Sequence, residues 1–60
     1  MRSRELERLL LEDGWYIKNQ KSSHRQYKHP TKSGKVTIPF HRGDIDIGTA
    51  ASILKQAGLK

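Results

Sequence analysis

The sequence predicts an α+β fold in which a helix, three short strands and a second helix follow one another. Three observations lead to this prediction. Leucines recur at helical spacing near the N-terminus, small and apolar residues do so near the C-terminus, and side chains alternate in character between these segments. A chain of 60 residues is the length of one small domain, so we expect residues 1–60 to form a three-stranded antiparallel sheet with both helices on one face.

The first predicted helix begins near Ser3, a residue type that is favoured as an N-cap. Leu6, Leu9 and Leu10 are spaced so that they form one apolar stripe along a helix. Gly14 then supplies the left-handed conformation in which many helices end. We therefore expect the helix to lie between Ser3 and Gly14.

The three predicted strands span residues 15–20, 24–29 and 35–39. The first starts with aromatic and β-branched residues, and the other two alternate between residue types. Residues 21–23 are polar and predict a turn, while residues 30–34 contain the Pro, Ser and Gly that are typical of a loop.

Strand alternation sorts the side chains of these segments into two faces. One face is apolar and should form the core, with Trp15, Ile17, Tyr27, Val36 and Ile38. The other face is polar and basic, with Tyr16, Lys18, Gln20, His24, Gln26, Lys28, Lys35 and Thr37. Antiparallel sheets commonly leave one side in water, so the sequence predicts an open, basic sheet face.

The second predicted helix lies near residues 48–57. Ala50, Ala51 and Leu54 follow the helical pattern of apolar residues, and Gly58 is a suitable C-cap. The two alanines are small enough to let this helix lie close to the sheet or to the first helix.

The positive charge is concentrated in the middle of the chain. The net charge is +6, with −1 in residues 1–13, +7 in residues 14–43 and zero in residues 44–60. Residues 14–43 contain no acidic side chain. Such an asymmetry indicates a polyanionic partner, with nucleic acid first among them, whereas a surface chosen only for solubility usually mixes both signs.

Composition excludes several other classes. The chain has no Cys, which rules out disulfides and thiolate metal sites. The histidines have no carboxylate near them in sequence between residues 14 and 43, so we expect no metal site and no cofactor. The charged start of the chain lacks the apolar run of a signal peptide, and no segment is long enough to cross a membrane, so we expect a cytoplasmic protein.

Among the three histidines, His24 is the strongest candidate for chemistry. Histidine exchanges protons near neutral pH, and RNA can be cleaved without a metal when its own 2′-hydroxyl attacks the adjacent phosphorus. From the residues alone, an exposed turn residue remains the simpler interpretation of His24. His29 has the inward parity of a structural residue, and His41 lies in an uninformative loop.

The motifs along the chain resemble the HicA toxins, the RNA-cleaving half of HicAB toxin–antitoxin pairs. The matching segments cover nearly the whole chain: Asp13-Gly14-Trp15, Ser23-His24-x-Gln26-Tyr27-Lys28-His29-Pro30, Val36-Thr37-Ile38-Pro39, Ile47-Gly48-Thr49 and Ser52 to Leu59. The resemblance implies a fold similar to the double-stranded-RNA-binding domain. It also implies that His24, in the family's Gly-Ser-His motif, is the catalytic residue of an endoribonuclease that cleaves mRNA.

The resemblance and the predicted basic face together give a set of residues for RNA binding: Tyr16, Lys18, Lys21, Ser23, Arg25, Gln26, Lys28 and Lys35. Tyr16 is the one aromatic residue placed to stack on a base, since Trp15 and Tyr27 are expected in the core. The resemblance further implies a HicB-type antitoxin, with an acidic surface over His24 and with oligomerisation through that partner.

Two positions depart from the family pattern. Ser22 stands where the family has Gly, in a turn where a positive φ is expected, and Asp46 stands where the family often has Pro. Asp46 is itself a suitable N-cap for the second helix.

The leading hypothesis is thus a metal-independent ribonuclease of a toxin–antitoxin system. One alternative is a non-catalytic module that binds double-stranded RNA through shape and phosphates. Another is a protein-binding subunit whose positive charge meets an acidic partner. A steep fall of RNA affinity with salt would favour the first two, because bound Lys and Arg release counterions.

Overall fold

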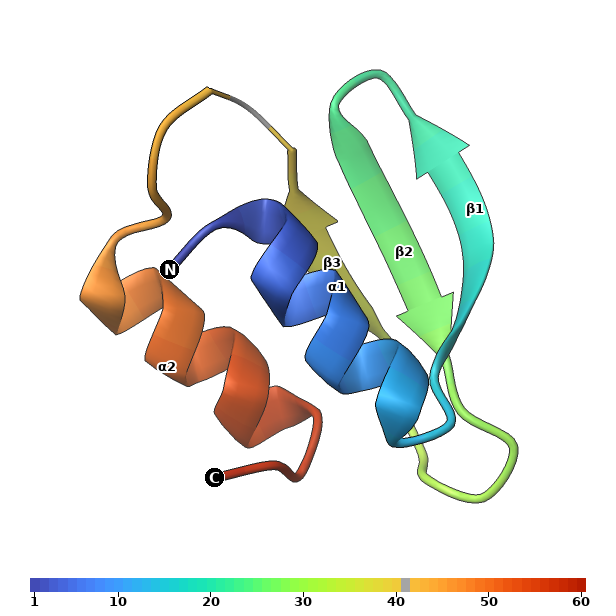
Figure 1. Cartoon of the computed structure of the whole chain (residues 1–60). Helices are drawn as coiled ribbons and strands as arrows, with labels where there is room; N and C mark the ends of the chain where they lie inside the picture. The colour runs from blue at the N-terminus through green and yellow to red at the C-terminus, as the bar shows by residue number, and fades with distance from the viewer. Residues whose placement is uncertain (41) are drawn as a thin grey trace.

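The computed structural model describes residues 1–40 and 42–60 and confirms the predicted order of elements (Figure 1). The elements are α1 (Ser3–Glu12), β1 (Tyr16–Lys21), β2 (His24–Lys28), β3 (Val36–Pro39) and α2 (Ile47–Gln56). The strands form one antiparallel sheet in the order β1-β2-β3, so β2 is the central strand. The fold is therefore the predicted α-β-β-β-α arrangement with an open sheet.

Both helices pack on one face of the sheet, as Figure 1 shows. The buried core joins apolar residues of α1, α2 and the strands with residues next to these elements: Leu6, Leu10, Trp15, Tyr27, Val36, Ile38, Ile45, Ala50, Ile53 and Ala57. The helices cover the side of the sheet on which Tyr27 lies, and they leave the opposite side open.

Ile17 was expected in the core but is 44% exposed, so this part of the core prediction is wrong. Ile17 pairs with the buried Tyr27 and therefore faces the helix side of the sheet. However, β1 is an edge strand, and Figure 1 shows it lying beyond the two helices. Ile17 therefore lies on the predicted face of the sheet, but neither helix extends far enough to bury it.

The start of α1 also differs from the prediction. Arg2, not Ser3, is the N-cap, and its backbone N–H donates to Glu5 Oε1 over 3.0 Å. Ser3 is the first residue of the helix and is 5% exposed, and its hydroxyl donates to the carbonyl oxygen of Pro39 over 2.7 Å. The hydroxyl of Ser3, which was expected to cap the helix, thus bonds to the end of β3 instead.

Asp46 caps α2 as predicted. Its Oδ2 accepts a hydrogen bond from the backbone N–H of Thr49 over 3.1 Å. This bond satisfies one of the free N–H groups at the start of a helix. The carboxylate therefore provides a helix start at the position where the family often has Pro.

A bulge in β1 changes which side chains reach the open face. The register runs from Ile17 paired with Tyr27 directly to Asn19 paired with Gln26, and it skips Lys18. One additional residue reverses the alternation of the strand beyond it. Lys21 consequently faces the open side, whereas Gln20, predicted there, pairs with Arg25 on the helix side. The prediction for Gln20 is therefore wrong.

The hairpin between β1 and β2 has a two-residue turn. Lys21 and His24 form the last pair, and Ser22 and Ser23 lie between them. Ser22 has a φ of +56°, and it is the one residue other than glycine with a positive φ in the described part of the chain. This is the conformation in which glycine is favoured, so Ser22 carries local backbone strain.

We predict that Ser22→Gly stabilises the protein by about 0.5–1 kcal/mol, because the left-handed strain of an L residue exceeds the added entropy of glycine in the unfolded chain. Urea unfolding measures this change. Ser23→Gly is the matched control, since Ser23 has no positive φ and the same substitution should destabilise there. Equal effects of the two substitutions would contradict the strain at Ser22.

Candidate nucleic-acid interface

The open face of the sheet consists of three rows of paired residues. Cross-strand partners point to the same side and lie close together. The rows are Tyr16 with Lys28, then Asn19 with Gln26 and Thr37, and finally Lys21 with His24 and Pro39. The face is therefore polar, with a cation in each outer row and no carboxylate in any of the three.

His24 lies at the hairpin end of this face. It is the first residue of β2, it is exposed, and it is paired with Lys21 on one side and with Pro39 on the other. The position leaves the imidazole accessible from the open side. Lys21 brings positive charge to the same row.

The structure brings together most of the residues that the sequence predicted for RNA binding. Tyr16, Lys21, Gln26 and Lys28 share the open face with His24. Three of the other predicted residues lie at its borders. Lys18 is exposed at the bulge, Ser23 lies in the turn, and Lys35 is exposed just before β3. Asn19 and Thr37 also belong to the face, and of these Asn19 was missed because the bulge was not predicted.

Arg25 is the exception, because it faces the helices. Its Nη1 donates to Glu7 Oε2 over 2.8 Å, and its guanidinium lies 4.0 Å from the centre of the Phe40 ring. The hydrogen bond to the Glu7 carboxylate raises the pKa of Arg25. Arg25 is two residues from the buried Tyr27, so strand parity already contained the signal for this placement.

Glu7 also holds the central tyrosine. The hydroxyl of Tyr27 donates to Glu7 Oε2 over 2.5 Å, and the Tyr27 residue is fully buried. Burial first, and then the Glu7 carboxylate, raises the pKa of Tyr27. One carboxylate oxygen of α1 therefore accepts hydrogen bonds from two neighbouring inward residues of β2.

His29 has the structural role that its parity predicted. Its side chain is 8% exposed, and its Nδ1 accepts hydrogen bonds from the backbone N–H groups of Thr31 and Lys32, each over 3.1 Å. An Nδ1 that accepts leaves the proton on Nε2, which donates to the carbonyl oxygen of Asp13 over 2.7 Å. A Cβ on Gly14 would lie 2.9 Å from Nε2, so glycine is required there. His41 lies outside the described residues.

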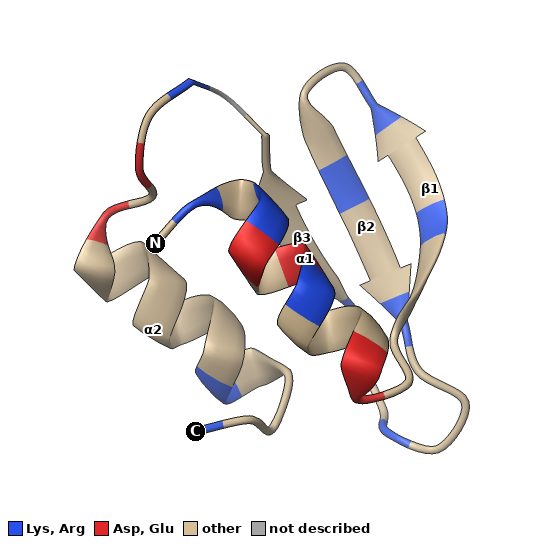
Figure 2. Ribbon diagram, viewed as in Figure 1, with Lys and Arg blue, Asp and Glu red and all other residues tan. Residues whose placement is uncertain are grey.

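Lys32 is bound within the fold and does not join the open face. Its Nζ donates to Asp13 Oδ2 over 2.5 Å and to the carbonyl oxygen of Ala57 over 2.9 Å. The hydrogen bond from Lys32 lowers the pKa of Asp13. The ammonium group thus joins the ends of α1 and α2. Figure 2 shows acidic residues in α1 and before α2, whereas the charged residues of β1 and β2 are all Lys or Arg and β3 has none.

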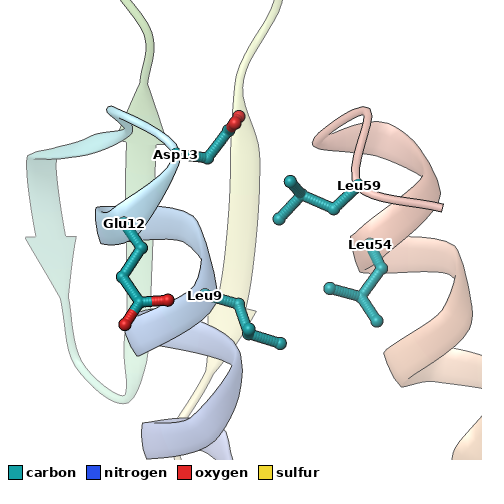
Figure 3. Close-up of a pocket in the computed structure, with 5 residues that line it drawn as sticks. All are labelled: Leu9, Glu12, Asp13, Leu54 and Leu59. Carbon is teal, nitrogen blue, oxygen red and sulfur yellow. The ribbon is translucent and has the colours of Figure 1, made fainter.

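A groove of about 310 Å³ lies between α1 and α2, on the helix side of the molecule (Figure 3). It is lined by Leu9, Leu54 and Leu59, with Glu12 and Asp13 at one end. Carboxylates repel phosphate, so this groove does not suit a nucleic acid. The groove is therefore separate from the basic face in both position and charge.

Among the described residues, no three His, Asp or Glu side chains gather in a way that could hold a metal ion. Neither of the described helices is long and apolar enough to cross a membrane.

The fold and the basic open face define a small α+β protein of the double-stranded-RNA-binding-domain type. Residues 3–59 match the family model described as the HicA toxin of bacterial toxin–antitoxin systems. Since this match spans nearly the whole chain of 60 residues, the chain belongs to the HicA toxin family, as its motifs predicted. Membership implies an antitoxin partner. A search of curated proteins finds no match.

The raised pKa of Tyr27 predicts a loss of stability at alkaline pH. A group whose pKa is higher in the folded state stabilises the fold fully below its unfolded pKa, about 10 for tyrosine, and this stabilisation is lost as the pH rises through the folded value. In Tyr16→Phe protein, Tyr27 is the one remaining tyrosine. Its phenolate absorbance should appear only together with the loss of far-ultraviolet circular dichroism.

The same variant unfolded in urea is the control, and its phenolate should form near pH 10. Ionisation at that pH while the protein keeps its circular dichroism would show that Tyr27 is not held as described.

Proposed function

We propose that this chain is a metal-independent endoribonuclease that cleaves mRNA and that His24 is its catalytic residue. The observation that carries the proposal is the exposure of one imidazole on a sheet face that contains cations and no carboxylate. His29 cannot take this role, because both of its ring nitrogens are engaged inside the fold. Family membership supports the same function.

The proposed reaction uses the RNA as its own nucleophile. The 2′-oxygen attacks the adjacent phosphorus, the bond from phosphorus to the 5′-oxygen breaks, and a 2′,3′-cyclic phosphate and a 5′-hydroxyl are formed. His24 accepts the proton of the 2′-hydroxyl, and water or a protonated Lys supplies the proton to the 5′-oxygen. Because the nucleophile comes from the substrate, the reaction requires no metal ion.

The residues around His24 have proposed roles in binding. Lys21, Lys28 and Lys35 hold phosphates and stabilise the charge that develops on the phosphorus oxygens. Lys18 adds charge at the bulge. The polar side chains of Ser23 and Gln26 provide hydrogen bonds to the backbone or bases. Tyr16 is about half exposed beside Lys28, where its ring can stack on a base.

The proposed partner in regulation is a HicB-type antitoxin. To silence the enzyme it must cover His24 and neutralise the surrounding Lys side chains, which requires an acidic contact surface. We further propose that the whole chain acts as one toxin domain in the cytoplasm, where translated mRNA is found, and that it forms larger assemblies through the antitoxin.

We predict that His24→Gln lowers the rate of RNA cleavage by about 10²–10⁴-fold, the usual contribution of a general acid–base group. The assay measures the decay of a single-stranded RNA by antitoxin-free protein in the presence of EDTA. Asn19→Ala on the same face is the matched control and should retain most activity. Intact RNA with wild-type protein would reject the enzyme and leave the alternative of a non-catalytic RNA-binding module.

The proposed phosphate contacts predict a strong dependence of RNA affinity on salt. For a single strand, each phosphate contact contributes about 0.7 to the slope of log affinity against log salt concentration. In the His24→Gln background, which leaves the RNA intact, Lys28→Gln should reduce the slope by about 0.7. Arg4→Gln, on exposed helix surface, should leave it unchanged. A shallow slope in the parent protein would favour the protein-binding alternative.

A further inference from the structure

Arg25 follows His24 directly in the chain but faces the other side of the sheet. Two contacts occupy its guanidinium. Its Nη1 donates to Glu7 of α1 over 2.8 Å, and the central carbon of the guanidinium lies 4.0 Å from the centre of the Phe40 ring. The side chain is 29% exposed. A guanidinium that donates to a carboxylate on one side and lies over a ring is restricted in orientation, and on this side of the sheet it is not available to an RNA phosphate on the opposite face.

The same contacts reach both chain neighbours of His24. Phe40 donates its backbone N–H to the carbonyl oxygen of Ser23 over 2.6 Å, while its ring lies against Arg25. Glu7 holds Arg25 from the helix layer and is itself 19% exposed at its side chain. The residue before His24 and the residue after it are therefore both attached to elements outside the hairpin.

The hairpin places His24 at the end of the sheet, between two strand partners. The turn is only two residues long, and it contains the strained Ser22. On one side His24 pairs with Lys21 of the edge strand β1, which the helices do not cover. On the other side it pairs with Pro39. The next pair, Ser23 with Phe40, is hydrogen-bonded, so the pair of His24 and Pro39 is a non-hydrogen-bonded one. The hydrogen bond to Phe40 and the contact with α1 are thus made by the chain neighbours of His24: Ser23 accepts from Phe40, and Arg25 contacts Phe40 and Glu7.

We propose that Arg25 is a positioning residue for His24, which it holds in place from behind the sheet through its contacts with Glu7 and Phe40. The inference rests on the proposed ribonuclease function and replaces the predicted RNA-binding role of Arg25. A displacement of about 1 Å at a reacting group can cost about 10²-fold in rate. Arg25 thus affects the rate of cleavage without touching the substrate.

The test separates kcat from KM in the cleavage of a fluorescently labelled single-stranded RNA. Arg25→Met removes the charge and the planar stacking group, and it should lower kcat by about 10–100-fold with KM unchanged. Arg25→Lys keeps the charge near Glu7 and should restore part of the loss. Glu7→Gln weakens the hydrogen bond between Arg25 and α1 by removing the charge of its acceptor, and it should lower kcat in the same way.

Two matched variants define the comparison. Lys18→Met removes a cation at the bulge, where the proposed role is binding alone, and should mainly raise KM. Arg4→Met removes an arginine from exposed helix surface and should change neither constant. All assays are made below the unfolding temperature of each variant. If Arg25→Met does not fold, Arg25→Lys and Glu7→Gln decide the question by the same readout.

A kcat equal to that of wild type in these variants would overturn the positioning role, and a raised KM with unchanged kcat would return Arg25 to RNA binding. Both results require an active wild-type protein that loses its activity in His24→Gln. If wild type does not cleave RNA, the proposed function fails, and the positioning role fails with it. If wild type cleaves RNA but the Arg25 and Glu7 variants keep its kcat, only the positioning role fails.

Discussion

The burial of Tyr27 is the constraint on which the rest of this structure depends. Tyr27 lies in the central strand, it is fully buried against the helices, and its hydroxyl donates to Glu7. Because successive side chains of a strand point to opposite faces, the burial of Tyr27 determines the side on which each neighbouring residue of β2 lies. Arg25 must face the helices, whereas His24 and Lys28 must face the open side. One buried side chain thus determines the orientation of the whole strand.

The separation of charge follows from the same arrangement. Two acids at the helix layer bond to basic side chains within the fold, since Glu7 holds Arg25 and Asp13 holds Lys32. β1 and β2 contribute the cations Lys21 and Lys28 to the open face, and none of the three strands contributes a carboxylate. The open side of the sheet therefore has four cations, Lys21 and Lys28 on the face and Lys18 and Lys35 at its borders, which create a positive field there. This is the field that would attract a polyanion, and it would also repel a second copy of the same face.

The limits of prediction are visible at individual residues. His24, Gln26 and Lys28 could be placed correctly because period two holds along the regular strand β2. Gln20 was misplaced because a bulge at Lys18 reverses the alternation, and nothing in the local composition marks this bulge. Parity places Arg25 inward beside Tyr27, as observed, although the predicted set of RNA-binding residues included it.

The sequence by itself determined the order of the elements, the open basic face, the family and the capping of α2 by Asp46, because these depend on periodicity, charge and motifs within short segments. Tertiary structure alone decided which groups meet across the chain. The hydroxyl of Ser3 bonds to Pro39, Ile17 is exposed at an uncovered edge of the sheet, and Glu7 bonds to Arg25. Such contacts depend on how far the helices extend over the sheet, and this distance is not encoded in any local pattern.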